Sequence, residues 1–198
     1  LIRVLERHGA EVVNSSLAEW VNYISYGQYR KNKTHLRLNL RQFHLKRLKT
    51  DLEKMLDFGS ELFYQELRQK QFYRRISKSI DIAHDHKVHH LKRLLHEEDI
   101  FTFDITTETC LSIAAILQFA KEGYNGVVNV YPFTCMPGMT TSAIVKPVMN
   151  KRRVPYLDTP YDGSLQPGRE TAIRTFMHQV QQHYQRYGRK GCIQQRAA

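Results

Sequence analysis

The second half of the chain alternates between short apolar runs and longer amphipathic stretches. Runs rich in β-branched residues at 100–105, 126–131 and 154–157 predict strands. After each run, apolar residues recur every three or four positions, which predicts a helix closed by Gly123 and further helices over 139–150 and 169–187. Strands that alternate with helices at this spacing form right-handed βαβ units, so the pattern predicts a parallel sheet.

The first residues of the chain extend the same pattern. Residues Leu1 to His8 predict a short helix that ends at Gly9, and residues 11–13 predict a short strand. Ser15 or Ser16 can then cap a helix whose apolar residues recur at i, i+3, i+4 and i+7, namely Leu17, Trp20, Val21 and Ile24. We therefore expect an α/β fold, a Rossmann-like or flavodoxin-like three-layer domain with a parallel sheet of about four strands.

The middle of the chain has a different character. From His35 to His96 the apolar residues follow a helical period without a proline, and Gly59 is the expected break between two or three helices. Such a segment cannot form part of a parallel sheet, so we expect it to be an insertion. The predicted domains are the start of the α/β domain at 1–27, a basic helical insertion at 28–99, the α/β domain with its cysteine loop at 100–188, and a flexible tail at 189–198.

The charge of the chain is concentrated in this middle segment. The net charge is +11, and residues 28–93 hold 17 Lys and Arg against 7 Asp and Glu, a net charge of +10. A basic helical segment can bind phosphate backbones or an acidic protein surface. The aromatic residues within it fall near the apolar positions of the helices, and no recognisable nucleic-acid-binding module is present. These observations disfavour nucleic acid and leave docking to an acidic partner, or a homodimer, open.

Composition narrows the setting further. No run of about 18 apolar residues is present, so we expect no membrane span. The first residues are amphipathic and include Glu6, which is not typical of a signal peptide. The sequence opens within a predicted helix and without Met, so we expect it to be cut from a longer protein. Three cysteines are too few for a disulfide framework, and we expect a reducing, cytoplasmic location.

The strongest chemical signal is Cys135, which follows the strand predicted at 126–131. Three strand-to-helix loops, at 106–108, 133–138 and 159–163, are expected at one sheet edge, where open α/β sheets bind ligands. A cysteine before a helix N-terminus is favoured as the thiolate, the form that binds metal or attacks electrophiles. The alternative is an inert buried cysteine.

The residues after Cys135 restrict its chemistry. Thr140 and Thr141 stand where a phosphatase-like thiolate loop would carry an arginine, which excludes that chemistry. Either threonine can cap the following helix, Gly138 is expected to relieve the turn, and Pro147 is expected to kink or shorten the helix. Walker-type and dinucleotide-type glycine loops are absent from the sequence, so we expect no ATP site within these residues.

A second candidate is the histidine-rich stretch at 84–90. His86 and His90 would share a helix face at i, i+4, the spacing that zinc-binding helices use. Asp85 and His89 point elsewhere on such a helix, and nothing nearby supplies a strong closing ligand. A solvated histidine-rich helix face is therefore favoured over a metal site.

Residues 125–138, which contain the string Phe-Thr-Cys-Met-Pro-Gly, resemble the cluster-binding segment of proteins related to 2-hydroxyacyl-CoA dehydratase and benzoyl-CoA reductase subunits. The branch of CoA-substrate-specific enzyme activases is the nearest in pattern, with the double-cubane cluster proteins as relatives. Residues 17–21, 145–151, 154–157, 161–163 and 175–179 extend the resemblance. It is strong from about 123 to 179 and weak before Tyr26.

The resemblance implies that Cys135 is one ligand of an iron–sulfur cluster of the [4Fe–4S] kind. It implies that the other ligands, and a separate ATPase portion, lie in upstream domains of the same polypeptide. The chemistry of the family is ATP-driven, low-potential electron transfer in anaerobic metabolism, with an acyl-CoA substrate in the dehydratases. Thr134, Gly138, Glu108 and Asp162 match loop positions of the family, whereas Cys110 stands where the family has an aliphatic residue. The isolated chain is expected to be apo and colourless, because a four-iron cluster usually takes four thiolates.

Overall fold

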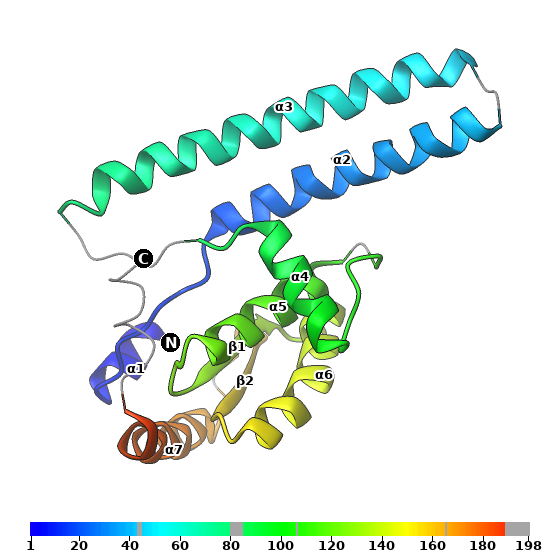
Figure 1. Ribbon diagram of the computed structural model, residues 1–198. Coiled ribbons are helices and arrows are strands. Elements are labelled where there is room, and N and C mark those ends of the chain that lie inside the picture. The colour runs from blue at the N-terminus through cyan, green and yellow to red at the C-terminus, as the bar shows by residue number, and fades with distance from the viewer. Residues whose placement is uncertain (43–44, 80–84, 106, 165, 189–198) are drawn as a thin grey trace. The chain divides into compact units, whose positions relative to one another are not determined.

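The computed structural model describes the chain except for residues 43–44, 80–84, 106, 165 and 189–198, so the predicted flexible tail lies outside the described residues (Figure 1). Seven helices and two strands are formed by the described residues. In chain order they are α1 (Ile2–Arg7), α2 (Leu17–Arg41), α3 (Leu45–Ile76), α4 (Val88–Glu98), α5 (Glu108–Lys121), β1 (Val127–Pro132), α6 (Met136–Arg152), β2 (Tyr156–Tyr161) and α7 (Arg169–Tyr187).

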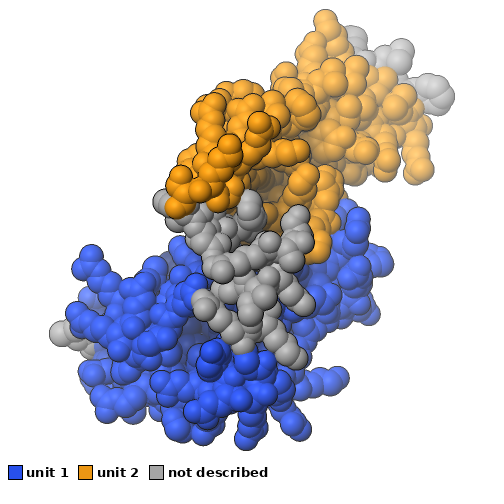
Figure 2. Space-filling view, turned by 60° about the vertical axis from the view of Figure 1, so that its left-hand side comes forward, with its two compact units in different colours: residues 1–14, 91–198 blue, residues 15–90 orange. Residues whose placement is uncertain are grey.

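The chain divides into two compact units (Figure 2). Unit 1 comprises residues 1–14 and 91–198, and unit 2 comprises residues 15–90. The second boundary falls within α4. The helical insertion therefore spans 15–90 in the structure, whereas the sequence pattern places it at 28–99.

Unit 1 is built on a two-stranded parallel sheet. β1 and β2 pair in register from Val127 opposite Tyr156 to Pro132 opposite Tyr161. Val128 and Leu157 pack on one face against a cluster from α1 and α7 that contains Leu5 and Phe176.

The other face of the sheet is covered by α6. Asn129 Nδ2 donates to the Gly138 carbonyl over 3.3 Å, and the Tyr131 ring lies against Gly138. α5 packs beside α6. The fully buried side chains of unit 1 come mainly from the helices and include Leu91, Leu95, Ile113, Leu117, Val145 and Met149.

Two of the four predicted strands are not strands in the structure. Residues 11–13 have no regular structure, and Val12 packs beside the cluster of α1 and α7 as part of a loop. The run at 100–105 forms a turn, in which the Asp104 N–H donates to Thr102 Oγ1 over 3.1 Å and Phe103 is buried. Both runs bury apolar side chains without pairing to a neighbouring strand, so the described residues support a mixed α/β class with a smaller sheet.

Unit 2 is dominated by two long antiparallel helices, α2 and α3. Ser16 caps α2 as predicted, because its Oγ accepts the Ala18 N–H at 3.0 Å. The predicted break at Gly59 is wrong, since Gly59 lies inside α3, where a Cβ added to it would lie 3.5 Å from the Tyr29 ring. The chain instead leaves α2 after Arg41, before the residues at 43–44.

Polar side chains bond across the interface between α2 and α3. Asn22 Nδ2 donates to Gln69 Oε1 over 3.0 Å, and Gln65 Nε2 donates to Ser25 Oγ over 3.1 Å. Further along, Asn39 Nδ2 donates to an Asp51 carboxylate oxygen. The sides of α2 and α3 that point away from this interface carry exposed apolar residues. On α2 they are the residues of the predicted apolar row, Leu17, Trp20, Val21 and Ile24.

None of the helices that the structure describes has an apolar stretch long enough to cross a lipid bilayer.

Candidate functional site

The loops that follow β1 and β2 lie together at the carboxyl edge of the sheet. β1 and β2 end side by side, and the Phe133 N–H donates to the Tyr161 carbonyl over 2.7 Å. The start of α5 reaches the start of α6, where Thr109 Oγ1 donates to the Pro137 carbonyl over 3.5 Å. The parallel pairing of β1 and β2 therefore brings the cysteine loop beside the loop that follows β2, as the sequence predicts, whereas α5 follows a turn and not a third strand.

Cys135 is the N-cap residue of α6 and is partly exposed to solvent. Its backbone N–H donates to the Pro132 carbonyl at 3.0 Å, and its side chain makes no capping hydrogen bond. α6 thus begins three residues before the predicted start at 139. Pro137 fits in the first turn because its missing N–H would have no helical partner there.

The two threonines expected to cap the helix have other places. Thr140 lies within α6, and the fully buried Thr141 donates through its Oγ1 to the Pro137 carbonyl at 2.8 Å. Pro147 does not shorten the helix, which continues to Arg152. Thr141 therefore bonds to the first turn from within the helix, and Cys135 occupies the capping position.

Thr134 gives the cysteine loop its unusual backbone. Its φ is +64°, in the left-handed region that β-branched residues rarely adopt. Its Oγ1 donates to the Phe133 carbonyl over 2.6 Å. Backbone strain of this kind costs about 1–3 kcal/mol and is found most often at functional sites. The sequence pattern does not reveal this feature.

Gly138 serves packing and not the turn. It is buried within α6, and a Cβ at this position would lie 2.4 Å from Tyr131 Cγ and 2.5 Å from Tyr131 Cβ. A glycine is therefore required for the first turn of α6 to lie against the Tyr131 ring. The expectation that Gly138 relieves the turn is wrong, since the left-handed residue of this loop is Thr134.

A polar network behind the loop fastens α6 to the sheet. Asp158 on β2 accepts hydrogen bonds from Ser142 Oγ at 2.5 Å, from Tyr156 OH at 2.8 Å and from Asn129 Nδ2 at 3.3 Å. Burial, together with the hydrogen bond to Asp158, raises the pKa of Tyr156 above its usual value. Sequence reasoning missed this network, because the register that sets Asn129 opposite Asp158 follows from the pairing of β1 with β2 and not from either run alone.

The other predicted loop residues have local roles. Asp162 is exposed and accepts the Ser164 side-chain hydroxyl at 2.7 Å and the Ser164 N–H at 2.9 Å, which lowers the pKa of its carboxyl. Glu108 is exposed in the first turn of α5. Cys110 is completely buried, and its thiol lies 2.9 Å from the Thr107 carbonyl. Of the two cysteines that the structure describes, only Cys135 has a thiol within reach of solvent.

Exposed apolar side chains accompany the cysteine loop. Phe133 and Met136 flank Cys135 in the chain, and Met139 lies in the first turn of α6. We call these three residues the apolar rim, and between 53% and 68% of each is exposed. Single exposed apolar residues are common, whereas a group of three next to one thiol is typical of a surface that another protein element covers.

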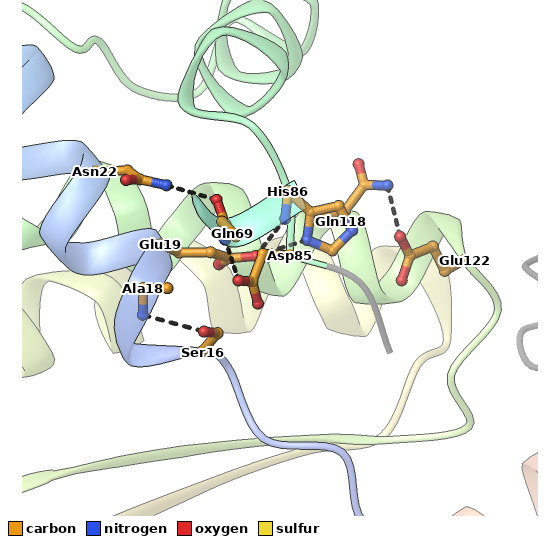
Figure 3. Close-up of polar contacts among 9 residues, drawn as sticks. All are labelled: Ser16, Ala18, Glu19, Asn22, Gln69, Asp85, His86, Gln118 and Glu122. Carbon is orange, nitrogen blue, oxygen red and sulfur yellow. Dashed lines mark hydrogen bonds and ion pairs between the residues drawn. The ribbon is translucent and has the colours of Figure 1, made fainter. Parts of the chain in front are cut away.

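The histidine-rich stretch is organised by Glu19 and not by a helix face. α4 begins at Val88, so His86 precedes it and does not share a helix face with His90. The buried Glu19 carboxylate accepts the His86 N–H at 2.6 Å and lies 3.0 Å from His86 Nδ1 (Figure 3). Gln69 Nε2 donates to Asp85 in the same group of contacts. His84 lies outside the described residues.

Within the described part of the chain, no three His, Cys, Asp or Glu side chains converge in a group that could hold a metal ion. Cys135 fits the requirement for one thiolate ligand of a larger set, because it is accessible and stands at a helix N-terminus. The chain has three cysteines in all, fewer than the four thiolates of a usual four-iron cluster. Comparison of the chain with models of protein families, with curated proteins and with solved structures found no match.

Proposed function

We propose that unit 1 is the C-terminal domain of an iron–sulfur electron-transfer component related to the 2-hydroxyacyl-CoA dehydratases and their activases. In this proposal Cys135 supplies one thiolate ligand of the cluster. The observation that carries the proposal is the position of Cys135, which is accessible, caps α6, follows a strained residue and lies within the apolar rim.

The position of Cys135 at the start of α6 supports a ligand role, since metal-binding cysteines are often found at helix N-termini. The Cys135 side chain makes no capping hydrogen bond that would have to be broken when a metal binds. Gly138 and the Asp158 network fix α6 against the sheet, so the ligand is held on rigid elements.

The apolar rim supports a site that is completed by other protein. A cluster buried among apolar side chains is shielded from water, and this shielding is one of the factors that set its reduction potential. When bound, the cluster would supply single-electron transfer at low potential. The remaining ligands, an ATPase portion and an acyl-CoA site would lie in upstream domains. A larger Rossmann-like sheet, of which β1 and β2 would form part, and a cytoplasmic location belong to the same proposal.

The test is iron and sulfide analysis of the natural full-length polypeptide, purified without oxygen. We expect Cys135→Ala to lose cluster iron, while Cys110→Ala, which removes a buried thiol away from the loop surface, retains it. Cluster content that is unchanged in Cys135→Ala would disprove the ligand assignment. The 198-residue chain alone should be colourless after purification under the same conditions.

A second candidate function is a non-redox binding module. Unit 2 holds 15 Lys and Arg against 8 Asp and Glu, a net charge of +7 over residues 15–90. Such a charge favours an acidic protein partner or nucleic acid. Binding of DNA, RNA or an acidic protein that weakens steeply with salt would support this function, and absence of binding at low salt would remove it.

A further inference from the structure

One face of α3 carries a row of exposed apolar side chains. The row consists of Leu52, Leu56, Phe63 and Leu67, and between 42% and 71% of each residue is exposed. Their spacings of four, seven and four residues place them on the same side of a helix. The row is about 22 Å long, since each helical residue advances about 1.5 Å.

The row does not serve the pairing of α2 with α3. The α3 residues that bond to α2 are Asp51, Gln65 and Gln69, which fall on a different side of the helix. The hairpin is therefore closed by a different face of α3, and the apolar row is left for another contact.

The order of residues along the row is symmetric about its centre. Gly59 and Ser60 stand in the middle, with Leu56 and Phe63 at equal distances on either side and Leu52 and Leu67 beyond them. A second α3 running antiparallel would place Leu52 opposite Leu67 of the second copy, and Leu56 opposite Phe63 of the second copy. The small Ser60 at the crossing point allows the helices to approach closely, whereas Gly59 is turned toward the Tyr29 ring of α2.

We propose that two copies of this chain associate through this row, with α3 packed antiparallel on α3 about a twofold axis near residues 59 and 60. A twofold interface must use the same patch on both copies, and the symmetric order meets this condition. An interface of one helix face and this length is at the low end of protein–protein interfaces, roughly 1,000 Å² in total. The pair is accordingly weak and reversible. This inference does not involve Cys135, so it holds or fails independently of the proposed function.

The charges at the ends of the row distinguish a dimer of this chain from a complex with a different partner. Lys49 and Lys70 continue the same face of α3 beyond the two ends of the row. In the antiparallel pair, Lys49 of one copy lies opposite Lys70 of the second copy, and these like charges repel each other. Salt screens this repulsion, so the dimer becomes tighter as the salt concentration rises. An acidic partner or nucleic acid on the same face would instead be released by salt.

The first experiment is sedimentation equilibrium of the whole chain from about 1 to about 200 µM, the range in which a weak dimer dissociates. We expect a monomer–dimer equilibrium that Leu56→Lys with Phe63→Lys weakens about 100-fold or more, because both changes remove central apolar contacts. Leu40→Lys is the matched control, since Leu40 is 56% exposed on α2 and outside the row. A monomer at every concentration, or a dimer that the double substitution leaves intact, would overturn the proposal.

The second experiment tests the register. In a chain with Cys135→Ser and Cys192→Ser, Ser60→Cys should form a disulfide between copies on mild oxidation, because position 60 lies at the proposed axis. Glu61→Cys is the control, since the next helical residue is turned by about 100° away from the row. Cross-linking at position 61 as fast as at position 60 would contradict the antiparallel pairing. A chain that stays monomeric but binds an acidic polypeptide would assign the row to an acidic protein partner and would refute the dimer.

Discussion

Replacing Gly138 by alanine tests how α6 is placed behind the cysteine loop. The added Cβ would lie 2.4 Å from Tyr131 Cγ and 2.5 Å from Tyr131 Cβ. The Tyr131 atoms cannot move aside easily, because Tyr131 Cβ is bonded directly to the backbone of β1 and Tyr131 Cγ is bonded to that Cβ. The first turn of α6 would have to shift away from the sheet, and Cys135 would shift with it.

The magnitude follows from two opposing effects. Overpacking of a well-packed site costs about 1–3 kcal/mol, and contacts this short with atoms at the base of a side chain belong at the upper end. Alanine is a better helix former than glycine by about 1 kcal/mol. The expected net loss in the stability of unit 1 is therefore about 2 kcal/mol, which corresponds to about a 30-fold change in the opening equilibrium.

The assay is site-resolved alkylation of Cys110, followed by peptide mass spectrometry. Cys110 is completely buried in unit 1, so its thiol reacts only when the unit opens. We expect the Gly138→Ala chain to react about 30-fold faster at Cys110. Gly27→Ala is the matched control, because Gly27 lies in α2 with no atom within 4 Å of its added Cβ.

A double variant separates the clash from the helix propensity. In a Tyr131→Gly background both short contacts are absent, so Gly138→Ala should now stabilise unit 1 by about 1 kcal/mol and slow the reaction of Cys110 about fivefold. Slower alkylation after Gly138→Ala in the unmodified chain would refute the reasoning, since it would mean that the Tyr131 ring does not occupy this space.

Three further predictions concern strain and protonation in unit 1. Thr134→Gly should slow Cys110 alkylation about fivefold, because release of the left-handed strain outweighs the added freedom of glycine by about 1 kcal/mol, whereas Thr134→Val should not. Burial lowers the pKa of His183 below its ordinary 6.5, so the unfolded chain binds a proton at a higher pH than the folded chain does. The urea midpoint of unit 1 should therefore fall as the pH drops through 6.5, and it should fall less in the His183→Gln chain. Burial and Asp158 raise the pKa of Tyr156 above its ordinary 10.0, so stability should be lost as the pH rises beyond 10.0, and a Tyr156→Phe chain with an unchanged alkaline profile would contradict this.

The elements that the sequence predicts well are those with a clear period and clear ends. The helix expected over 169–187 is confirmed, because its apolar positions repeat at helical spacing and Gly188 follows it. The strand before Cys135 and the position of the thiol at the start of a helix are confirmed to within a few residues. Both predictions depend on local pattern, which tertiary contacts did not override.

The features that the sequence does not predict depend on partners distant in the chain. An apolar period such as Leu17, Trp20, Val21 and Ile24 shows which residues share a face, but not whether that face is covered. In α2 the covered face is the polar one that meets α3. The strain at Thr134 depends on how the loop closes between β1 and α6, which no local preference of threonine indicates.

The polar contacts between α2 and α3 have a consequence for how the hairpin responds to temperature. Exposure of apolar surface raises the heat capacity of unfolding, whereas exposure of polar surface lowers it. A hairpin closed by Asn22 with Gln69 and by Ser25 with Gln65 exposes much polar surface when it opens. Its free energy should therefore vary with temperature along a flatter curve than that of unit 1, whose core is apolar. Cooling, which weakens apolar packing, should thus affect the hairpin less than the sheet domain.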